Sequence, residues 1–246
     1  MSIASVVGLI MIRNLVDLEA IRGDGDAIGT YLQVVGGIYA VLLAFVVVVV
    51  WGQFNDGRTY VHREANALID LHRTSSGLPD SARDVIQQGL RDYVEAVIAE
   101  EWHAMTKGDQ ATIDKIAQRL DRVWDAIHSC MPLNDCQHTV YAEVLARFND
   151  LSELRTNRLT AAAAKIPIAM NVLLYTGAII MVCSIYLLPF DRFWVHATVT
   201  AALAGATAHI LFLIYDLDDA FAGDYQVGKG PFERARKSFE RNLPKA

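Results

Sequence analysis

The feature that most constrains this chain is a long uncharged run at residues 31–51, which reads YLQVVGGIYAVLLAFVVVVVW. An α-helix rises about 1.5 Å per residue, so a run of this length spans about 30 Å, the thickness of a bilayer's hydrocarbon core. Tyr31 and Trp51 close its ends, where amphipathic rings sit at lipid headgroups. Its valine-rich half would suit a buried strand, but buried strands are only about 4–8 residues long. The run therefore predicts a transmembrane helix.

Two sets of side chains divide this predicted helix lengthwise. Small residues recur every four positions along one side: Gly36, Ala40 and Ala44. Large apolar residues follow the opposite side: Ile38, Leu42, Phe45 and Val49. Small residues let helix backbones approach closely in lipid, so we expect the first side to pack against another helix. The second side faces either lipid, which the sequence favours, or a dry constriction in a pore.

Three further segments bear on the number of spans. Residues 2–15 are apolar but short, so they predict either a short first span, which we favour, or a helix in the membrane interface. Residues 168–188 form a second uncharged run of full length. After a tight turn, residues 194–215 return across the membrane. The chain is therefore predicted to be an all-α polytopic membrane protein with three to four transmembrane helices.

Charged residues are concentrated outside these runs. The chain has 246 residues and is 53 % hydrophobic, yet 20 % of its residues are charged, which indicates spans joined to a water-exposed part. Between the spans, apolar residues recur at helical spacing in four segments, so residues 52–166 predict an antiparallel helical bundle. The net charge of −6 argues against a nucleic-acid partner, which requires a basic surface.

The predicted organisation has four parts, namely an N-terminal membrane region at 1–51, the helical domain at 52–166, a membrane hairpin at 167–216, and a basic tail with little core at 217–246. Lys and Arg are sparse in the hairpin turn and frequent in the tail and at the flanks of the helical domain. The positive-inside rule therefore predicts that the helical domain and the C-terminus are cytoplasmic.

Four charged residues of the helical domain are candidates for function: Glu64, Glu101, Arg155 and Arg158. The two arginines are three residues apart, so they share one helix face. One interpretation is a basic ring that attracts anions at the inner mouth of a pore. The other, which we favour, is that the arginines pair with the two glutamates and lock the helices together, because buried charges are usually paired.

Two polar features lie in or after the last predicted span. His209 is an ionisable residue within the membrane and so a functional candidate, although a neutral imidazole bonded to a backbone carbonyl is the simpler interpretation. Asp216, Asp218 and Asp219 crowd the C-terminal end of that helix, where negative charge opposes the helix dipole. They would bind a cation such as Ca²⁺, pair with the arginines of the tail or, most simply, lie solvated at the surface. No metal site is predicted elsewhere in the chain.

Several motifs occur in the chain at spacings typical of one known family. They are the segment 36–45 (GGIYAVLLAF), Trp51, Glu64-Ala65, Tyr93, Glu101-Trp102, Arg155-x-x-Arg158-Leu159, Pro167 and Asp218-x-x-Phe221-x-Gly223. Together they resemble the bestrophin-like family of bacterial and plant membrane proteins. One departure is clear, because the family pattern Asp-Arg-Pro-Phe-x-Gly is here Asp-Asp-Ala-Phe-Ala-Gly.

The resemblance implies kinship with bestrophins, which are pentameric anion channels with four spans per subunit and a cytosolic helical domain. It implies five subunits that pass small anions such as chloride. The small-residue faces of the spans predict a homo-oligomer, and the hydropathy and charge asymmetry predict a bacterial inner-membrane protein. No enzyme motif is present, so we expect no catalytic site and no cofactor. The alternative function is a non-conducting membrane scaffold or sensor whose helical domain binds a partner.

Overall fold

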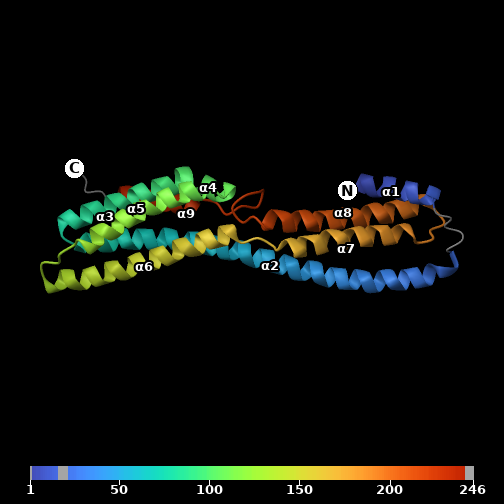
Figure 1. The fold of residues 1–246 in the computed structure, drawn as a ribbon, viewed down its shortest axis with the longest axis horizontal. Coiled ribbons are helices and arrows are strands. Elements are labelled where there is room, and N and C mark those ends of the chain that lie inside the picture. The colour runs from blue at the N-terminus through green and yellow to red at the C-terminus, as the bar shows by residue number, and fades with distance from the viewer. Residues whose placement is uncertain (1, 16–21, 242–246) are drawn as a thin grey trace. The chain divides into compact units, whose positions relative to one another are not determined.

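The structure is a computed structural model that describes residues 2–15 and 22–241, and this part of the chain forms helices and connecting turns without a strand (Figure 1). The predicted all-α class is confirmed. The chain divides into two compact units, the first made of Met1–Gly52 and Lys165–Asp218, the second of Gln53–Ala164 and Asp219–Ala246.

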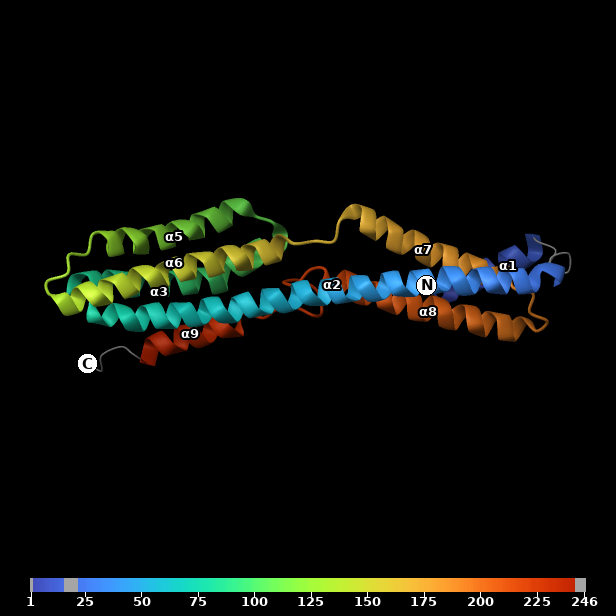
Figure 2. The same ribbon diagram turned by 90° about the horizontal axis from the view of Figure 1, so that it is seen from below.

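The first unit is a group of apolar helices that lie side by side (Figures 1 and 2). Its described elements are α1 (Ser2–Leu15), η1 (Arg22–Asp24), the first half of α2 (Gly25–Thr74), α7 (Ile168–Tyr186) and α8 (Phe193–Leu217). Pro167 precedes the first residue of α7, where its missing N–H costs no helical hydrogen bond.

Three helical stretches of the described chain are long and apolar enough to cross a membrane, judged by length and composition. They are Gly25–Gly77, Asp135–Tyr186 and Phe193–Leu217. Charged residues are frequent in the first two outside residues 31–51 and α7, so the parts with a composition suited to crossing are residues 31–51, α7 and α8. The shorter apolar helix α1 has 14 residues, in keeping with three to four spans.

Helices α2 and α7 approach closely at a glycine. The hydroxyl of Tyr39 donates a hydrogen bond to the carbonyl oxygen of Leu174 at 2.9 Å. The ring of Tyr39 lies over Gly177, where an added Cβ would be 2.5 Å from ring atom Cε2. The buried side chains of α2 in this unit are Tyr39, Leu43, Val46 and Val50. This contact face lies between the two faces that the sequence distinguished.

Replacing Gly177 by alanine should separate α2 from α7, because the new methyl group would collide with the Tyr39 ring. We expect a loss of about 1–3 kcal/mol, the usual cost of overpacking a filled core, seen as a lower thermal midpoint in detergent. Gly37→Ala is the matched control, since no atom outside its own helix lies within 4 Å of an added Cβ there. Equal midpoints for the two variants would contradict this packing.

The second unit is an antiparallel helical bundle around one apolar core. Its elements are the second half of α2, η2 (Ser75–Gly77), α3 (Asp80–Ala96), η3 (Val97–Glu101), α4 (Trp102–Lys107), α5 (Gln110–His128), α6 (Asp135–Ala163) and α9 (Gly230–Arg241). Gly108 ends α4 in the left-handed conformation with φ of 66°, which glycine adopts without strain. Asp109 then caps α5 by accepting a hydrogen bond from the backbone N–H of Thr112 at 3.2 Å.

The expectation that the C-terminal stretch has little core is wrong. Helix α9 buries Phe232, Ala235 and Phe239 in the core of the second unit, at the spacing of one helix face. Phe239 stacks on the buried His72 of α2 with ring centroids 4.4 Å apart. Figure 2 shows α9 running beside the second half of α2. Three apolar residues among many charges gave a weak hydropathy signal, although their spacing was informative.

The buried His72 makes the second unit sensitive to acid. Burial, with the nearby Arg91 cation, lowers the pKa of His72 to about 4, below the ordinary value of 6.5. On acidification His72 binds a proton in the unfolded chain at a pH where it stays neutral in the folded chain. The free energy of unfolding therefore decreases as the pH falls from about 6.5 towards 4.

Between pH 7 and pH 5 this effect should cost about 2 kcal/mol. His72→Phe keeps a ring against Phe239 but removes the proton site, so its stability should fall less than that of the wild type over the same interval. The exposed His103 supplies the control variant, His103→Phe. The explanation fails if both variants follow the wild-type pH dependence of unfolding.

Candidate functional site

The core of the second unit contains a fully buried arginine between two fully buried glutamates. Arg158 donates through Nε to Glu64 Oε2 at 2.6 Å and through Nη2 to Glu101 Oε2 at 2.7 Å. All three side chains are without solvent exposure. Charges removed from water in this way require direct partners, since the desolvation of each ion costs several kcal/mol.

Two more side chains complete this buried ion-pair cluster. Arg155 donates to Glu101 Oε1 at 2.5 Å and to the carbonyl oxygen of Ile113 at 3.1 Å. The Tyr93 hydroxyl donates to Glu64 Oε1 at 2.6 Å. Two guanidinium groups therefore face two carboxylates, and the formal charges of the cluster cancel.

The remaining faces of Arg158 meet polarisable groups. Its Nη1 lies 2.8 Å from the sulfur of Met105, and its guanidinium carbon lies 5.4 Å from the ring centre of Phe232 on α9. Trp102 stands edge-on to Phe232 at 5.9 Å and to Phe221 at 5.6 Å. These contacts are of the cation–π and aromatic kind, and they exclude water from the ion pairs.

The side chains of the cluster come from four segments of the unit, and α5 contributes the backbone carbonyl of Ile113. Glu64 comes from α2, Tyr93 from α3, and both arginines from α6. Glu101 ends η3, a π-helical turn that joins α3 to α4 without a break. A π-turn inserts an extra residue into a helix and is frequent at functional sites. The extra residue changes the direction in which the side chains of Glu101 and Trp102 point relative to the core.

The protonation states of Arg158 and Tyr93 are fixed around neutral pH. Burial opposes the charge on Arg158, but Glu64 and Glu101 raise its pKa well above the ordinary value, so the guanidinium stays charged. Burial and the same two carboxylates raise the pKa of Tyr93 well above 10, so the phenol stays a neutral donor. Such groups neither accept nor release protons near pH 7, and the arrangement suits structural locking rather than acid–base catalysis.

The structure brings together the four charged candidates from the sequence, in the arrangement of the pairing interpretation. Arg158 is fully buried, and the side chain of Arg155 is 12 % exposed. A ring of free arginines would need exposed guanidinium groups without acidic partners, and neither arginine provides one. Tyr93 entered the sequence analysis only as a family motif, and Met105, which contacts Arg158, was not singled out there.

The two predicted faces of α2 remain largely uncovered in the single chain. Ile38 is 68 % exposed, Phe45 62 % and Val49 38 %, whereas Leu42 is half-buried. On the small-residue side, Ala40 and Ala44 are exposed. Gly36 is half-buried, with an added Cβ 3.1 Å from Met181. Both faces are therefore available to lipid or to other subunits.

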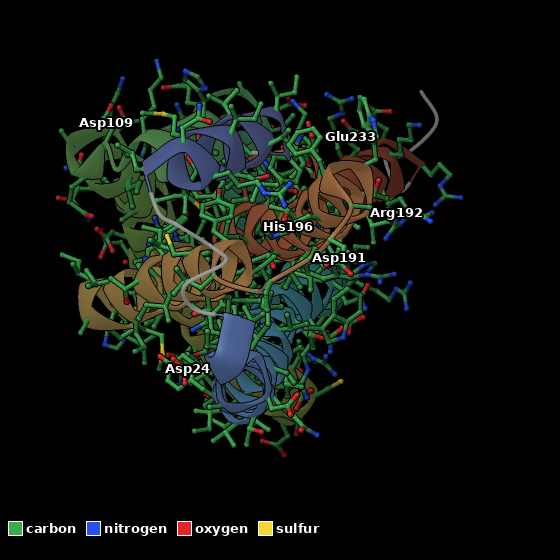
Figure 3. The ribbon with its side chains drawn as sticks, turned by 90° about the vertical axis from the view of Figure 1, so that its right-hand side faces the viewer. Asp24, Asp109, Asp191, Arg192, His196 and Glu233 are labelled. Atoms are coloured by element: carbon green, nitrogen blue, oxygen red, sulfur yellow. The ribbon has the colours of Figure 1, made fainter. Side chains whose placement is uncertain are left out.

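The histidine that the sequence singled out in the last span is not the one that the single chain buries. His209 is exposed in the single chain, whereas His196, near the start of α8, is fully buried. The imidazole Nε2 of His196 lies 2.9 Å from the carbonyl oxygen of Ile185, and its ring lies 4.7 Å from that of Phe190. Figure 3 shows His196 on the inner side of α8, after the turn that carries Asp191 and Arg192. The available signal was its helical spacing with Thr200 and Thr207, which are also buried.

The three aspartates after the last span have separate surroundings. Asp216 is buried, Asp218 accepts a hydrogen bond from the backbone N–H of Ile166 at 2.6 Å, and Asp219 accepts one from that of Phe221 at 3.4 Å. Within residues 2–15 and 22–241, no three His, Cys, Asp or Glu side chains gather as a metal ion would need. The geometry gives no support to a Ca²⁺ site at these aspartates.

The fold and the cluster define an all-helical membrane protein with a charged-core helical unit inserted between its spans. More particularly, the chain belongs to the bestrophin-like family, since the model of the Bestrophin-like domain matches residues 1–232. No curated protein sequence matches the chain. The predicted family resemblance is confirmed.

Solved structures support the same fold. A variant of a bacterial bestrophin homologue from Klebsiella pneumoniae matches with a TM-score of 0.73 at 12 % identity, covering 99 % of each chain. A second variant matches with a TM-score of 0.71 at 16 % identity, covering 98 % of this chain and 97 % of that one. A structure of a homologue from the same organism, solved by Zn-SAD phasing, gives 0.68 at 14 % identity, covering 98 % and 96 %. At these identities the likeness establishes the fold.

Removing one partner from the cluster should be far more damaging than removing an exposed ion pair. Arg158→Met leaves Glu64 and Glu101 without their shared partner and should cost about 3–5 kcal/mol of unfolding free energy. Arg147→Met is the control, because Arg147 pairs with Glu143 at the surface, where such pairs contribute at most about 1 kcal/mol. Chemical unfolding followed by circular dichroism measures both. A mild effect of Arg158→Met would show that the cluster does not hold the unit together.

Proposed function

We propose that the protein is an oligomeric bestrophin-like channel that passes small anions such as chloride across the bacterial inner membrane, and that it is not an enzyme. Membership of the bestrophin-like family supports a channel. The structural observation that carries the proposal is the uncovered apolar stripe of α2, where Ile38 and Phe45 project from the chain.

In a ring of subunits this stripe would surround the symmetry axis. Ile38, Phe45 and Val49 would then form stacked apolar rings, with Leu42 beside them. Apolar rings offer nothing in place of an ion's hydration shell, so a narrow ring closes the path by losing its water. Phe45 is the largest of these side chains and lies near the middle of residues 31–51, so its ring would form the highest barrier.

The small-residue side of α2 suits contact between subunits. Ala40 and Ala44 are exposed in the single chain, and small residues allow close helix approach in lipid. When one surface of a subunit meets a different surface of the next copy, the assembly is a ring if the rotation closes. The family resemblance favours five subunits.

The second unit and the C-terminal residues belong on the cytoplasmic side in this proposal. The turn between α7 and α8 carries a single basic residue, Arg192, whereas Lys and Arg are frequent in α6 and α9. The positive-inside rule follows this bias. We assign the buried ion-pair cluster to holding the cytoplasmic bundle together, because its charges cancel and cannot concentrate anions.

Planar-bilayer recording of the purified oligomer tests the channel and its gate together. Phe45→Ala should widen the narrowest ring and raise single-channel conductance severalfold, with little change in the preference for chloride over sodium. Val48→Ala is the matched control, since Val48 is exposed on another side of the same helix. Ala40→Leu should instead lower the mass of the assembly in native detergent.

Two outcomes would contradict the proposal. Absence of current from a correctly assembled oligomer would contradict the proposed channel function. A current unchanged by Phe45→Ala but altered by Ala40→Leu in intact oligomers would show that the two faces of α2 have opposite roles.

A scaffold or sensor remains the second candidate because of an exposed apolar patch on the second unit. Met131 is 83 % exposed and Leu133 79 %, beside a hollow of about 480 Å³ that they line together with Val85 and Cys130. Exposed apolar patches of this kind often mark protein contacts. A partner that binds this patch on a protein without current would favour the scaffold.

A further inference from the structure

A group of basic side chains on the second unit lies where α9 packs beside α2. Arg58 and His62 are one helical turn apart on α2, and Arg234 comes from α9. Nη2 of Arg234 lies 3.4 Å from Nδ1 of His62. The burial of Phe232 and Phe239 holds α9 in place, so the position of Arg234 beside His62 follows from the core packing.

Carboxylates do not compensate this group. In the described part of the chain, neither Arg58 nor Arg234 makes an ion pair, whereas Arg236, two residues further along α9, lies 3.6 Å from Glu95. Burial lowers the pKa of His62, and the positive charges of Arg234 and Arg58 lower it further. The three groups therefore repel additional positive charge and present N–H donors without an acidic acceptor.

From this arrangement we infer that Arg58, His62 and Arg234 form a binding site for the phosphate group of an anionic phospholipid. Guanidinium groups bind phosphate oxygens through paired N–H donors, and the imidazole supplies a further donor. One phosphate would relieve the repulsion between the two arginines.

The position along α2 favours a lipid as the source of the phosphate. Arg58 follows Trp51 by seven residues, two turns of an unbroken helix and a rise of about 10 Å. Trp51 ends the predicted span, where tryptophan lies at the headgroup level. Basic side chains this close to a span end attract the anionic lipids of the cytoplasmic leaflet. The inference goes beyond the proposed channel, and it requires a membrane but no current.

Native mass spectrometry of the full-length protein in detergent tests this site with added phosphatidylglycerol or phosphatidylcholine. The wild type should retain phosphatidylglycerol in preference to phosphatidylcholine. The double variant Arg58→Gln, Arg234→Gln should lower the affinity for phosphatidylglycerol by about fivefold for each arginine and leave phosphatidylcholine unchanged. The double variant Lys115→Gln, Arg122→Gln removes the same charge from exposed positions on α5 and should behave as the wild type.

Each other outcome would overturn the inference. Equal retention of the two lipids by the wild type would show that the protein has no preference for the anionic lipid, and so no such site. An equal loss in both double variants would reduce the effect to net charge. Inorganic phosphate that binds the wild type alone, as tightly as the lipid and in competition with it, would show a site for free phosphate instead. Unchanged unfolding midpoints for both variants confirm that folding is not the cause.

Discussion

The second unit depends on the ion pairs that Arg158 makes with Glu64 and Glu101. Their geometry ties α2, the π-turn η3 and α6 to a single point without solvent. An apolar core tolerates some rearrangement, because one methyl group can replace another at modest cost. A buried charge does not, since leaving it unpaired is far more expensive than forming the pair. The cluster therefore selects one packing of these helices among the many that an apolar interface would permit.

Local signals predicted most of the fold. The turn at Gly77-Leu78-Pro79 and the left-handed Gly108 interrupt helices for reasons that act within a few residues, since Gly and Pro are the strongest local helix breakers. The predicted faces of α2 were less informative. A helix that is apolar all round has no polar side to mark its orientation, and the face that packs in the chain runs through Tyr39, Leu43 and Val46.

The remaining differences arise from partners distant in sequence. Phe232 and Phe239 become core residues because α2 and α3 offer an apolar surface for them. That surface is distant in sequence, so the C-terminal residues by themselves do not predict the contact. Met105 became a partner of Arg158 through the phase of α4, which the π-turn before it sets. The opposite charges of Glu64 and Arg158 predicted that they would pair. The distance between them could be known only from the folded chain.

The π-turn also makes the cluster dependent on chain length, separately from residue identity. A π-turn holds one residue more than an α-turn, and successive helix residues are about 100° apart around the axis, so removal of one residue from Val97–Glu101 would change which of its side chains face the core. A glutamate could then be retained in the sequence and still point away from Arg158. Comparison of homologues in this segment must therefore count residues between Tyr93 and Trp102 before it compares their identities, because a gap of one position changes which side chain meets the buried charge.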